Sequence, residues 1–222
     1  MPAGIVGWQR VGFPTESGEV RVAAKPGSPK ELLALLHLLH FDGATGLATR
    51  ISESEARRII AEVNQIWAPA GISIVVASIR NDNAVPNVDA IGWLTTSHDD
   101  EGPDGVLANL SLIRPAVVGE SGSLHVYFIG ALPCNGITML RRDDPRGRPD
   151  AVFVQDQPHL REVPGGGREP RARVLAHEIG HTLGLFHAPE GNQLMSPGST
   201  GVRLTESEIA TARQSITRNP RH

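Results

Sequence analysis

The chain has 222 residues, of which 40% are hydrophobic and 20% charged, a composition typical of a soluble globular protein with one large domain or two lobes on one core. Its formal net charge of −3 gives no reason to expect nucleic acid or an anionic membrane as a partner. The single cysteine, Cys134, excludes an intramolecular disulfide.

The N-terminal stretch, MPAGIVGWQRVG, lacks a basic segment followed by an apolar one, so we expect no Sec-type signal peptide in this chain. The longest apolar run, LLALLHLLHF, is too short to cross a bilayer and contains His37 and His40. The location therefore stays open between the cytoplasm and export by a non-Sec route. A monomer is expected.

Residues 1–50 predict an N-terminal extension that is either packed on the following domain or part of it. EVRVAA, residues 19–24, alternates in character and predicts a strand. PKELLALLHLLHF, residues 29–41, is apolar on nearly all sides and predicts a short buried helix.

A helix is predicted from the capping-box pair Ser52 and Glu55 to Pro69 and Gly71, which end it. The β-branched run ISIVVASI, residues 72–79, follows at once and predicts a strand covered on both faces.

Residues 81–122 are expected to be rich in loops, with the acidic segment HDDEGPDG at their centre. Its carboxylates offer oxygen ligands for a structural Ca²⁺, but they lack EF-hand spacing, and a solvated acidic loop is favoured. The acidic residues concerned are Asp99, Asp100, Glu101 and Asp104.

Three further strands are predicted: SLHVYFIGAL (123–132), CNGITML (134–140) as a short edge strand, and DAVFVQD (150–156). RRDDPRGR (141–148) carries both signs of charge and predicts a surface loop. The final helix, TESEIATARQSI, begins at a capping box formed by Thr205 and Glu208.

The segment VLAHEIGHTLGLFH carries ionisable groups on an apolar helix. His177 and His181 are four residues apart, so on a helix they project from one face and can share one metal ion. Neutral imidazole is a good zinc ligand, and a site with three protein ligands leaves a position for water. Glu178 is placed to act as general base for this metal-activated water.

Gly184 explains how a third ligand reaches the same ion. A continuing helix would carry His187 away, whereas a glycine tolerates the positive φ of a sharp turn that brings it back. The alternative is a buried helix whose histidines are hydrogen-bonded core residues. The five-residue pattern arises by chance in on the order of one such chain in 10^4, which favours the metal site.

HEIGHTLGLFH resembles the His-Glu-x-x-His-x-x-Gly-x-x-His signature of the metzincin zinc metallopeptidases. NQLMSPG is similar to the Met-turn of this family, in the matrixin-like form, with Met195 and Pro197 at the matching positions. Because Pro197 stands where some members carry a tyrosine, a tyrosine ligand is not implied. The helix ending VNQIWAPAGI is similar to that of pappalysin-like and related bacterial metzincins.

The resemblance implies an α+β fold with an α/β-like N-terminal lobe. It implies a twisted, mostly parallel mixed sheet with one antiparallel edge strand, backing and active-site helices, and a small irregular C-terminal lobe with a final helix. A catalytic domain of residues 51–222 is expected, divided into an upper lobe to about 184 and a lower lobe from 185. Substrate is implied to bind extended along the edge strand, taken as CNGITML, and Met195 to form an apolar floor beneath the metal.

Other candidates are weaker. His37 and His40 lack a third ligand nearby and are interpreted as satisfied by core or solvent. His125 and His159 are single histidines that could approach the cleft. Cys134 lies between predicted core strands and is interpreted as an edge-strand or buried thiol, in preference to a thiolate that caps the zinc.

The sequence therefore predicts a zinc endopeptidase with metal ligands His177, His181 and His187, and Glu178 as general base and acid. Alternatives are a specialised secreted effector or toxin protease with one partner substrate, and a catalytically inactive, zinc-stabilised binding module. The intact Glu178 argues against the last, since a structural zinc site needs no base.

Overall fold

The computed structural model of the protein describes residues 29–43, 46–96, 103–116, 123–158, 169–189 and 191–218. One sheet contains five strands: β1 Lys30–His40, β2 Ile72–Asn83, β3 Leu124–Ile129, β4 Gly136–Met139 and β5 Ala151–Gln155. The helices are α1 Glu53–Trp67, the 3₁₀-helix η1 Ala68–Ala70, α2 Val88–Thr95, α3 Pro103–Ile113, α4 Arg171–Thr182 and α5 Glu206–Arg218.

The strand order is β2-β1-β3-β5-β4; β4 runs antiparallel to β5, and all other neighbours are parallel. This mixed sheet with one antiparallel edge strand confirms the predicted fold class. CNGITML contains the edge strand β4, as predicted. None of the helices in the described part of the chain has the length and apolarity that crossing a bilayer demands.

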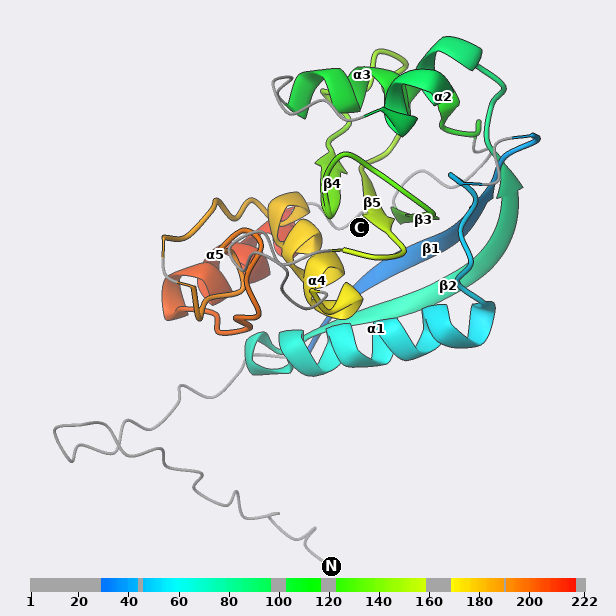
Figure 1. The fold of residues 1–222 in the computed structure, drawn as a ribbon. Helices are drawn as coiled ribbons and strands as arrows, with labels where there is room; N and C mark the ends of the chain where they lie inside the picture. Colours follow the sequence, from blue (N-terminus) through cyan, green and yellow to red (C-terminus); the bar gives the residue numbers. More distant parts are fainter. Residues whose placement is uncertain are drawn as a thin grey trace, which may run out of the picture.

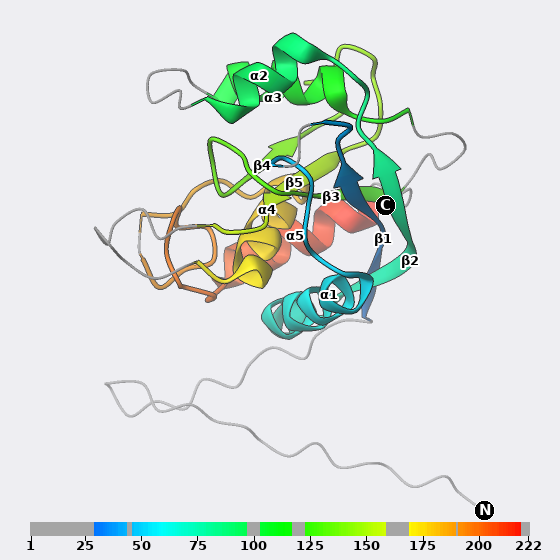
Figure 2. The same cartoon turned by 45° about the vertical axis from the view of Figure 1, so that its right-hand side comes forward.

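Helices cover both faces of the sheet, and Figures 1 and 2 show the resulting three layers. Successive residues of a strand point to opposite faces, so the sheet contributes to two cores. Val126 and Phe128 of β3 belong to the core shared with α1, α4 and α5, whereas Tyr127 and Ile129 belong to the core shared with α2 and α3. The sheet therefore holds α4 firmly from one side.

The predicted short helix at residues 29–41 is wrong, because this segment forms β1. β1 pairs in parallel with both β2 and β3, and its six residues from Ala34 to Leu39 are all buried. Leucine, lysine and glutamate are good helix formers, which favours a helix here. A central parallel strand covered on both faces also has a continuous apolar sequence, so the pattern fits either structure. Residues 30–40 thus belong to the same sheet as the strands that follow residue 50.

The prediction that residues 72–79 are covered on both faces is also wrong. β2 lies at the edge of the sheet and most of its residues are only partly buried. The expected strand at residues 19–24 lies outside the described residues.

Residues 81–122 contain two helices, α2 and α3, where loops were expected. The side chain of Asn87 accepts a hydrogen bond from the backbone N–H of Ala90 and caps α2, and Pro103 occupies the first position of α3. These two start signals were present in the sequence. Both helices are short, and their stability comes from packing on the sheet.

The segment 141–148 is not wholly a surface loop. The side chain of Asp144 is fully buried and pairs with Arg114 at 3.1 Å and with Arg148 at 2.7 Å. Arg114 is itself fully buried and its Nε lies 3.2 Å from the hydroxyl of Tyr127. This ion pair fastens the loop after β4 to the end of α3.

The predicted N-caps form at both α1 and α5, but only α5 has the complete capping box. At α5, the Glu208 backbone N–H donates to Thr205 Oγ1 and the Thr205 backbone N–H donates to the Glu208 carboxylate. At α1, Ser52 Oγ accepts from the Glu55 backbone N–H at 3.2 Å, but the Glu55 carboxylate pairs with α4 instead.

Candidate metal centre and active site

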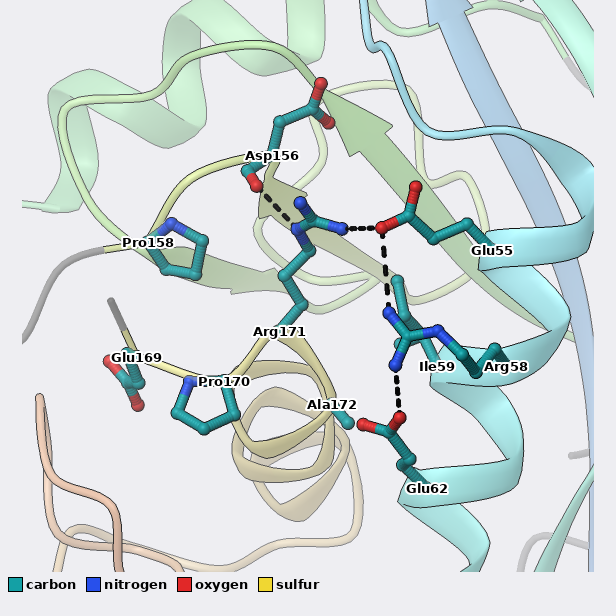
Figure 3. A pocket seen from close by; sticks show the side chains of 10 residues that line it. All are labelled: Glu55, Arg58, Ile59, Glu62, Asp156, Pro158, Glu169, Pro170, Arg171 and Ala172. Atoms are coloured by element: carbon teal, nitrogen blue, oxygen red, sulfur yellow. Dashed lines mark hydrogen bonds and ion pairs between the residues drawn. The ribbon is translucent and has the colours of Figure 1, made fainter. Parts of the chain in front are cut away.

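The start of α4 is fixed by Arg171. Its Nε donates to the backbone oxygen of Asp156 at 2.5 Å, and its guanidinium pairs with the Glu55 carboxylate of α1. The Asp156 carboxylate accepts hydrogen bonds of 2.6 Å from Thr49 Oγ1 and from the backbone N–H of Arg50. Figure 3 shows Arg171 between Asp156 and Glu55 in a pocket of about 280 Å³. The guanidinium of Arg171 is thus engaged by Glu55 and by the backbone of Asp156. These contacts join α4 to α1 and to the end of β5, and we assign this pocket a structural role.

The structure brings the three predicted metal ligands together. Nε2 of His181 lies 3.2 Å from Nε2 of His177 and 3.2 Å from Nε2 of His187. All three ligand atoms lie within 4.8 Å of one another. Within the described residues, no other group of three or more histidine, cysteine or carboxylate side chains is arranged to hold a metal ion.

Two of these histidines are held in the tautomer that binds a metal through Nε2. Nδ1 of His177 donates to the backbone oxygen of Leu194 at 2.8 Å, and Nδ1 of His181 donates to that of Leu185 at 2.9 Å. A carbonyl oxygen only accepts, so in each neutral ring Nε2 carries a lone pair. Burial lowers the pKa of His177 to about 3 and also lowers the pKa of His181, which keeps both rings neutral at pH 7.

These donors fit a zinc ion. Two Nε2 lone pairs that converge at 3.2 Å repel one another unless a cation lies between them. Imidazole nitrogen is a preferred zinc ligand, and a backbone carbonyl on the second ring nitrogen is the usual support of such a ligand.

Gly184 ends α4 and turns the chain back toward the metal centre. Its φ is +83°, a conformation that favours glycine. The backbone N–H of Leu185 donates to the oxygen of Gly180 at 2.9 Å, and that of Gly184 donates to the oxygen of His181 at 3.0 Å. This pair of bonds is the Schellman motif, which stops the helix and lets His187 approach.

Met195 is fully buried and packs against α4. A Cβ at Gly180 would lie 2.5 Å from the Met195 sulfur, so the absence of a side chain at Gly180 permits this close approach. The backbone oxygen of Met195 accepts from the N–H of Ala188, which ties the segment to the chain just after His187. The role of Met195 as an apolar floor stays a prediction.

Glu178 is buried beside the histidines and is held by β4. Thr138 Oγ1 lies 2.8 Å from Oε2 of Glu178 and 2.9 Å from its backbone oxygen. Thr138 was not singled out from the sequence, because its distance of 40 residues from Glu178 hides the contact. Only the pairing of β4 with β5 brings it to α4.

A pocket of about 110 Å³ lies beside Glu178. Pro197 and Gly198 form one part of its lining, and Asn135 and Gly136, at the start of β4, form another. Pro197 and Gly198 belong to the predicted Met-turn segment NQLMSPG, which therefore forms part of the pocket wall.

Arg173 fastens this wall to α4 and is a second site residue, after Thr138, that the sequence did not predict. Its Nη2 donates to the backbone oxygens of Leu194 and Ser196, and its Nε donates to that of Gly201 at 3.1 Å. Its charge is balanced by Glu169, which is also buried. An arginine one helical turn before His177, on the same face, was the available signal.

The weaker histidine candidates do not join the three metal ligands. His37 and His125 are buried together on the α2–α3 side of the sheet, with 3.0 Å between their facing ring nitrogens. Nε2 of His40 lies 3.1 Å from the side-chain oxygen of Asn81. Cys134 is half-buried just before β4. His37 and His40 thus have protein hydrogen-bond partners, in agreement with their interpretation from the sequence.

His159 and the acidic residues Asp99, Asp100 and Glu101 lie outside the described residues. Asp104 is described and lies in the first turn of α3.

No family model matches the chain. It is similar to two curated proteins named extracellular metalloprotease. The one from Arthroderma otae is 28% identical over 189 residues, 79% of this chain and 61% of that protein. The one from Arthroderma benhamiae is 30% identical over 159 residues, 68% of this chain and 50% of that protein. The chain thus spans between half and two thirds of these relatives' length.

Among solved structures, the fold is similar to mirolysin in complex with a small compound, with a TM-score of 0.52 and 14% identity over 85% of this chain and 91% of that chain. The promirolysin of Tannerella forsythia gives a TM-score of 0.51 and 12% identity, covering 88% of this chain and 84% of that chain. At these identities the likeness concerns the fold.

The mixed sheet, the convergent histidines of the HEIGHTLGLFH motif and the named relatives agree with one another. The chain thus has a metzincin-like fold, and its sequence is similar to those of proteins named extracellular metalloprotease.

Proposed function

We propose that the protein is a zinc-dependent endopeptidase that hydrolyses internal peptide bonds. The observation that carries this proposal is the convergence of three imidazole nitrogens next to a buried carboxylate, Glu178, which Thr138 holds in place. A bound zinc ion would supply Lewis acidity, which polarises a water molecule and the substrate carbonyl. His177, His181 and His187 would hold it.

Glu178 is the general base and acid of this proposal. Its carboxylate follows the first ligand on α4 and can accept a proton from the attacking water. It then passes the proton to the nitrogen of the departing amine. The hydrogen bond from Thr138 fixes one carboxylate oxygen, so little reorientation is needed between the two steps.

The proposed substrate is an extended peptide that adds to β4. β4 is the last strand of the sheet, and among the described residues no strand pairs with its outer side. Such an edge offers backbone N–H and C=O groups to an extended chain. The names of the curated relatives support a protein or peptide substrate.

The decisive test is Glu178→Gln, which keeps the volume of the side chain and removes its charge. We expect cleavage of an unstructured casein-like substrate to fall by about 10²–10⁴-fold, since this is the contribution of a positioned general base. Zinc content, measured by elemental analysis, should stay at the wild-type value. A chelator should abolish wild-type cleavage, and added zinc should restore it.

Two outcomes contradict the proposal in different ways. Unchanged cleavage by Glu178→Gln removes Glu178 from the reaction. A wild-type protein that binds zinc yet cuts neither casein nor a peptide library is the binding module considered from the sequence. Cleavage of one partner protein alone, without casein, identifies a dedicated protease instead of a general one.

A further inference from the structure

Two pockets adjoin the three histidines, at opposite ends of β4. The smaller one, described above, lies at the first residue of the strand, Gly136, and includes Glu178. The larger one, of about 460 Å³, lies just beyond the last residue, Met139, and includes Leu140 and Arg141. His181 lines this larger pocket, so it too borders the metal centre.

The position of Glu178 assigns the pockets to the two sides of a bound peptide; this step rests on the proposed function. Glu178 must reach the nitrogen of the leaving amine, which belongs to the C-terminal product. Glu178 lines the smaller pocket, so the C-terminal side of the scissile bond lies there. The larger pocket therefore receives side chains from the N-terminal side.

The larger pocket carries an excess of positive charge. Arg141 and Arg142 line it together with one carboxylate, Asp150. Oδ1 of Asp150 accepts a 2.6 Å hydrogen bond from the backbone N–H of Arg141 and is thus engaged by the main chain. Within the described residues, no hydrogen bond or ion pair engages the guanidinium of Arg141. Arg142 is exposed, and its Nε lies 3.6 Å from Asp143.

The smaller pocket differs in charge. Its two ionised groups besides Glu178 are Glu169 and Arg173, which are buried and paired with each other. Selection by charge is therefore expected on the N-terminal side of the scissile bond. The ring of Phe186, which is 87% exposed, also borders the larger pocket and offers an apolar contact to the stem of a substrate side chain.

We infer that the pocket formed by Arg141, Arg142 and Phe186 is a subsite for aspartate or glutamate side chains on the N-terminal side of the scissile bond. A guanidinium and a carboxylate form paired, charge-assisted hydrogen bonds, which are stronger than neutral ones. A lysine or arginine at the same substrate position meets like charge and is disfavoured.

The test uses N-acetylated tripeptides that end in a hydroxamate. The hydroxamate binds the metal, so the three side chains can occupy only the N-terminal side. Dissociation constants for the zinc-loaded protein are measured by calorimetry for a peptide with aspartate at one of the three positions and for its lysine twin. We expect the aspartate peptide to bind about tenfold more tightly at low salt, and the difference to shrink near 0.5 M salt.

Each single variant, Arg141→Glu or Arg142→Glu, should remove or reverse the tighter binding of the aspartate peptide. In the double variant, the lysine peptide should bind more tightly. Arg57→Glu is the matched control, because Arg57 is an exposed arginine on α1 that lines neither pocket. It should keep the wild-type preference. Equal binding of the aspartate and lysine peptides at all three positions overturns the inference, as does a preference that survives the double variant.

The binding measurement tests the subsite and the cleavage measurement tests the proposed function, so each proposal can be contradicted without the other. A protein that prefers the aspartate hydroxamates through Arg141 but cuts no peptide contradicts the proposed function and keeps the subsite. A protein that cuts casein but shows no charge preference keeps the proposed function and overturns the subsite.

Discussion

Thr138 Oγ1 contacts both the side chain and the backbone of Glu178, at 2.8 Å and 2.9 Å. β4 comes this near to α4 because residue 136 is a glycine. A Cβ at Gly136 would lie 2.7 Å from Cγ1 of Val174 and 3.0 Å from Cγ of Glu178. Thr138 is thus a positioning residue that acts through the proposed base.

Thr138→Val removes the hydroxyl and keeps the shape of the side chain. We expect kcat to fall about tenfold with little change in KM, because losing one hydrogen bond of about 1–1.5 kcal/mol misaligns the base without removing it. Thr138→Ser should restore most of kcat, and zinc content should be unchanged in both. A valine variant with wild-type kcat would remove Thr138 from the mechanism.

Gly184→Ala should destabilise the protein and weaken its hold on zinc. Space is available at Gly184, but its positive φ costs a residue with a Cβ about 1–2 kcal/mol. Strain at this turn also displaces His187, so we expect a higher dissociation constant for zinc in competition with a chelator. Gly92→Ala is the control: Gly92 lies within α2, has open space, and should gain up to about 1 kcal/mol of stability. Equal zinc affinity for Gly184→Ala and the wild type would contradict the proposed role of the turn.

Asp144→Ala should be among the most destabilising changes outside the metal centre. It leaves the fully buried guanidinium of Arg114 without its carboxylate, a loss of about 3–5 kcal/mol in the free energy of unfolding. Asp143→Ala, next to it in sequence but paired with an exposed arginine, should cost less than about 1 kcal/mol. Urea denaturation measures the free energy of unfolding of the two variants. Similar midpoints would show that the buried pair contributes little to stability.

His37 should make the unfolding free energy depend on pH. Its side chain is fully buried, and burial lowers its pKa, which outweighs the opposite effect of the hydrogen bond to Asp82 at 2.5 Å. Below about pH 6.5 the unfolded chain therefore binds a proton that the folded protein resists, so stability falls as the pH falls. Above that pH the ring is neutral in both states and has no effect.

The measurement compares His37→Gln with the wild type, both metal-free, between pH 5 and pH 8. We expect the slope of unfolding free energy against pH below 6.5 to decrease by up to about 1.4 kcal/mol per pH unit in the variant. The slope is informative even if His37→Gln lowers stability at every pH. His40→Gln, on the same strand but partly exposed, serves as control. Parallel curves for the wild type and His37→Gln would show that His37 does not titrate on unfolding.

The sequence by itself determined the features that depend on short distances along the chain. The four-residue spacing of His177 and His181 follows from the helical repeat, and Gly184 predicts the turn that returns His187. The capping box at Thr205 and Glu208 and the buried strand β3 are local in the same sense. In each case the interacting groups are near neighbours in sequence, so the pattern alone specifies the geometry.

Tertiary structure decided the features that depend on partners far away in the chain. Residues 30–40 have the composition of a helix and become β1 because strands at residues 72–83 and 124–129 flank them and helices cover both faces. Whether a strand is central or at an edge, as with β2, is likewise set by strand order. The contact of Thr138 with Glu178 and that of Arg114 with Asp144 arise only when separate elements pack. Their energies come from burial and pairing, which no local sequence pattern records.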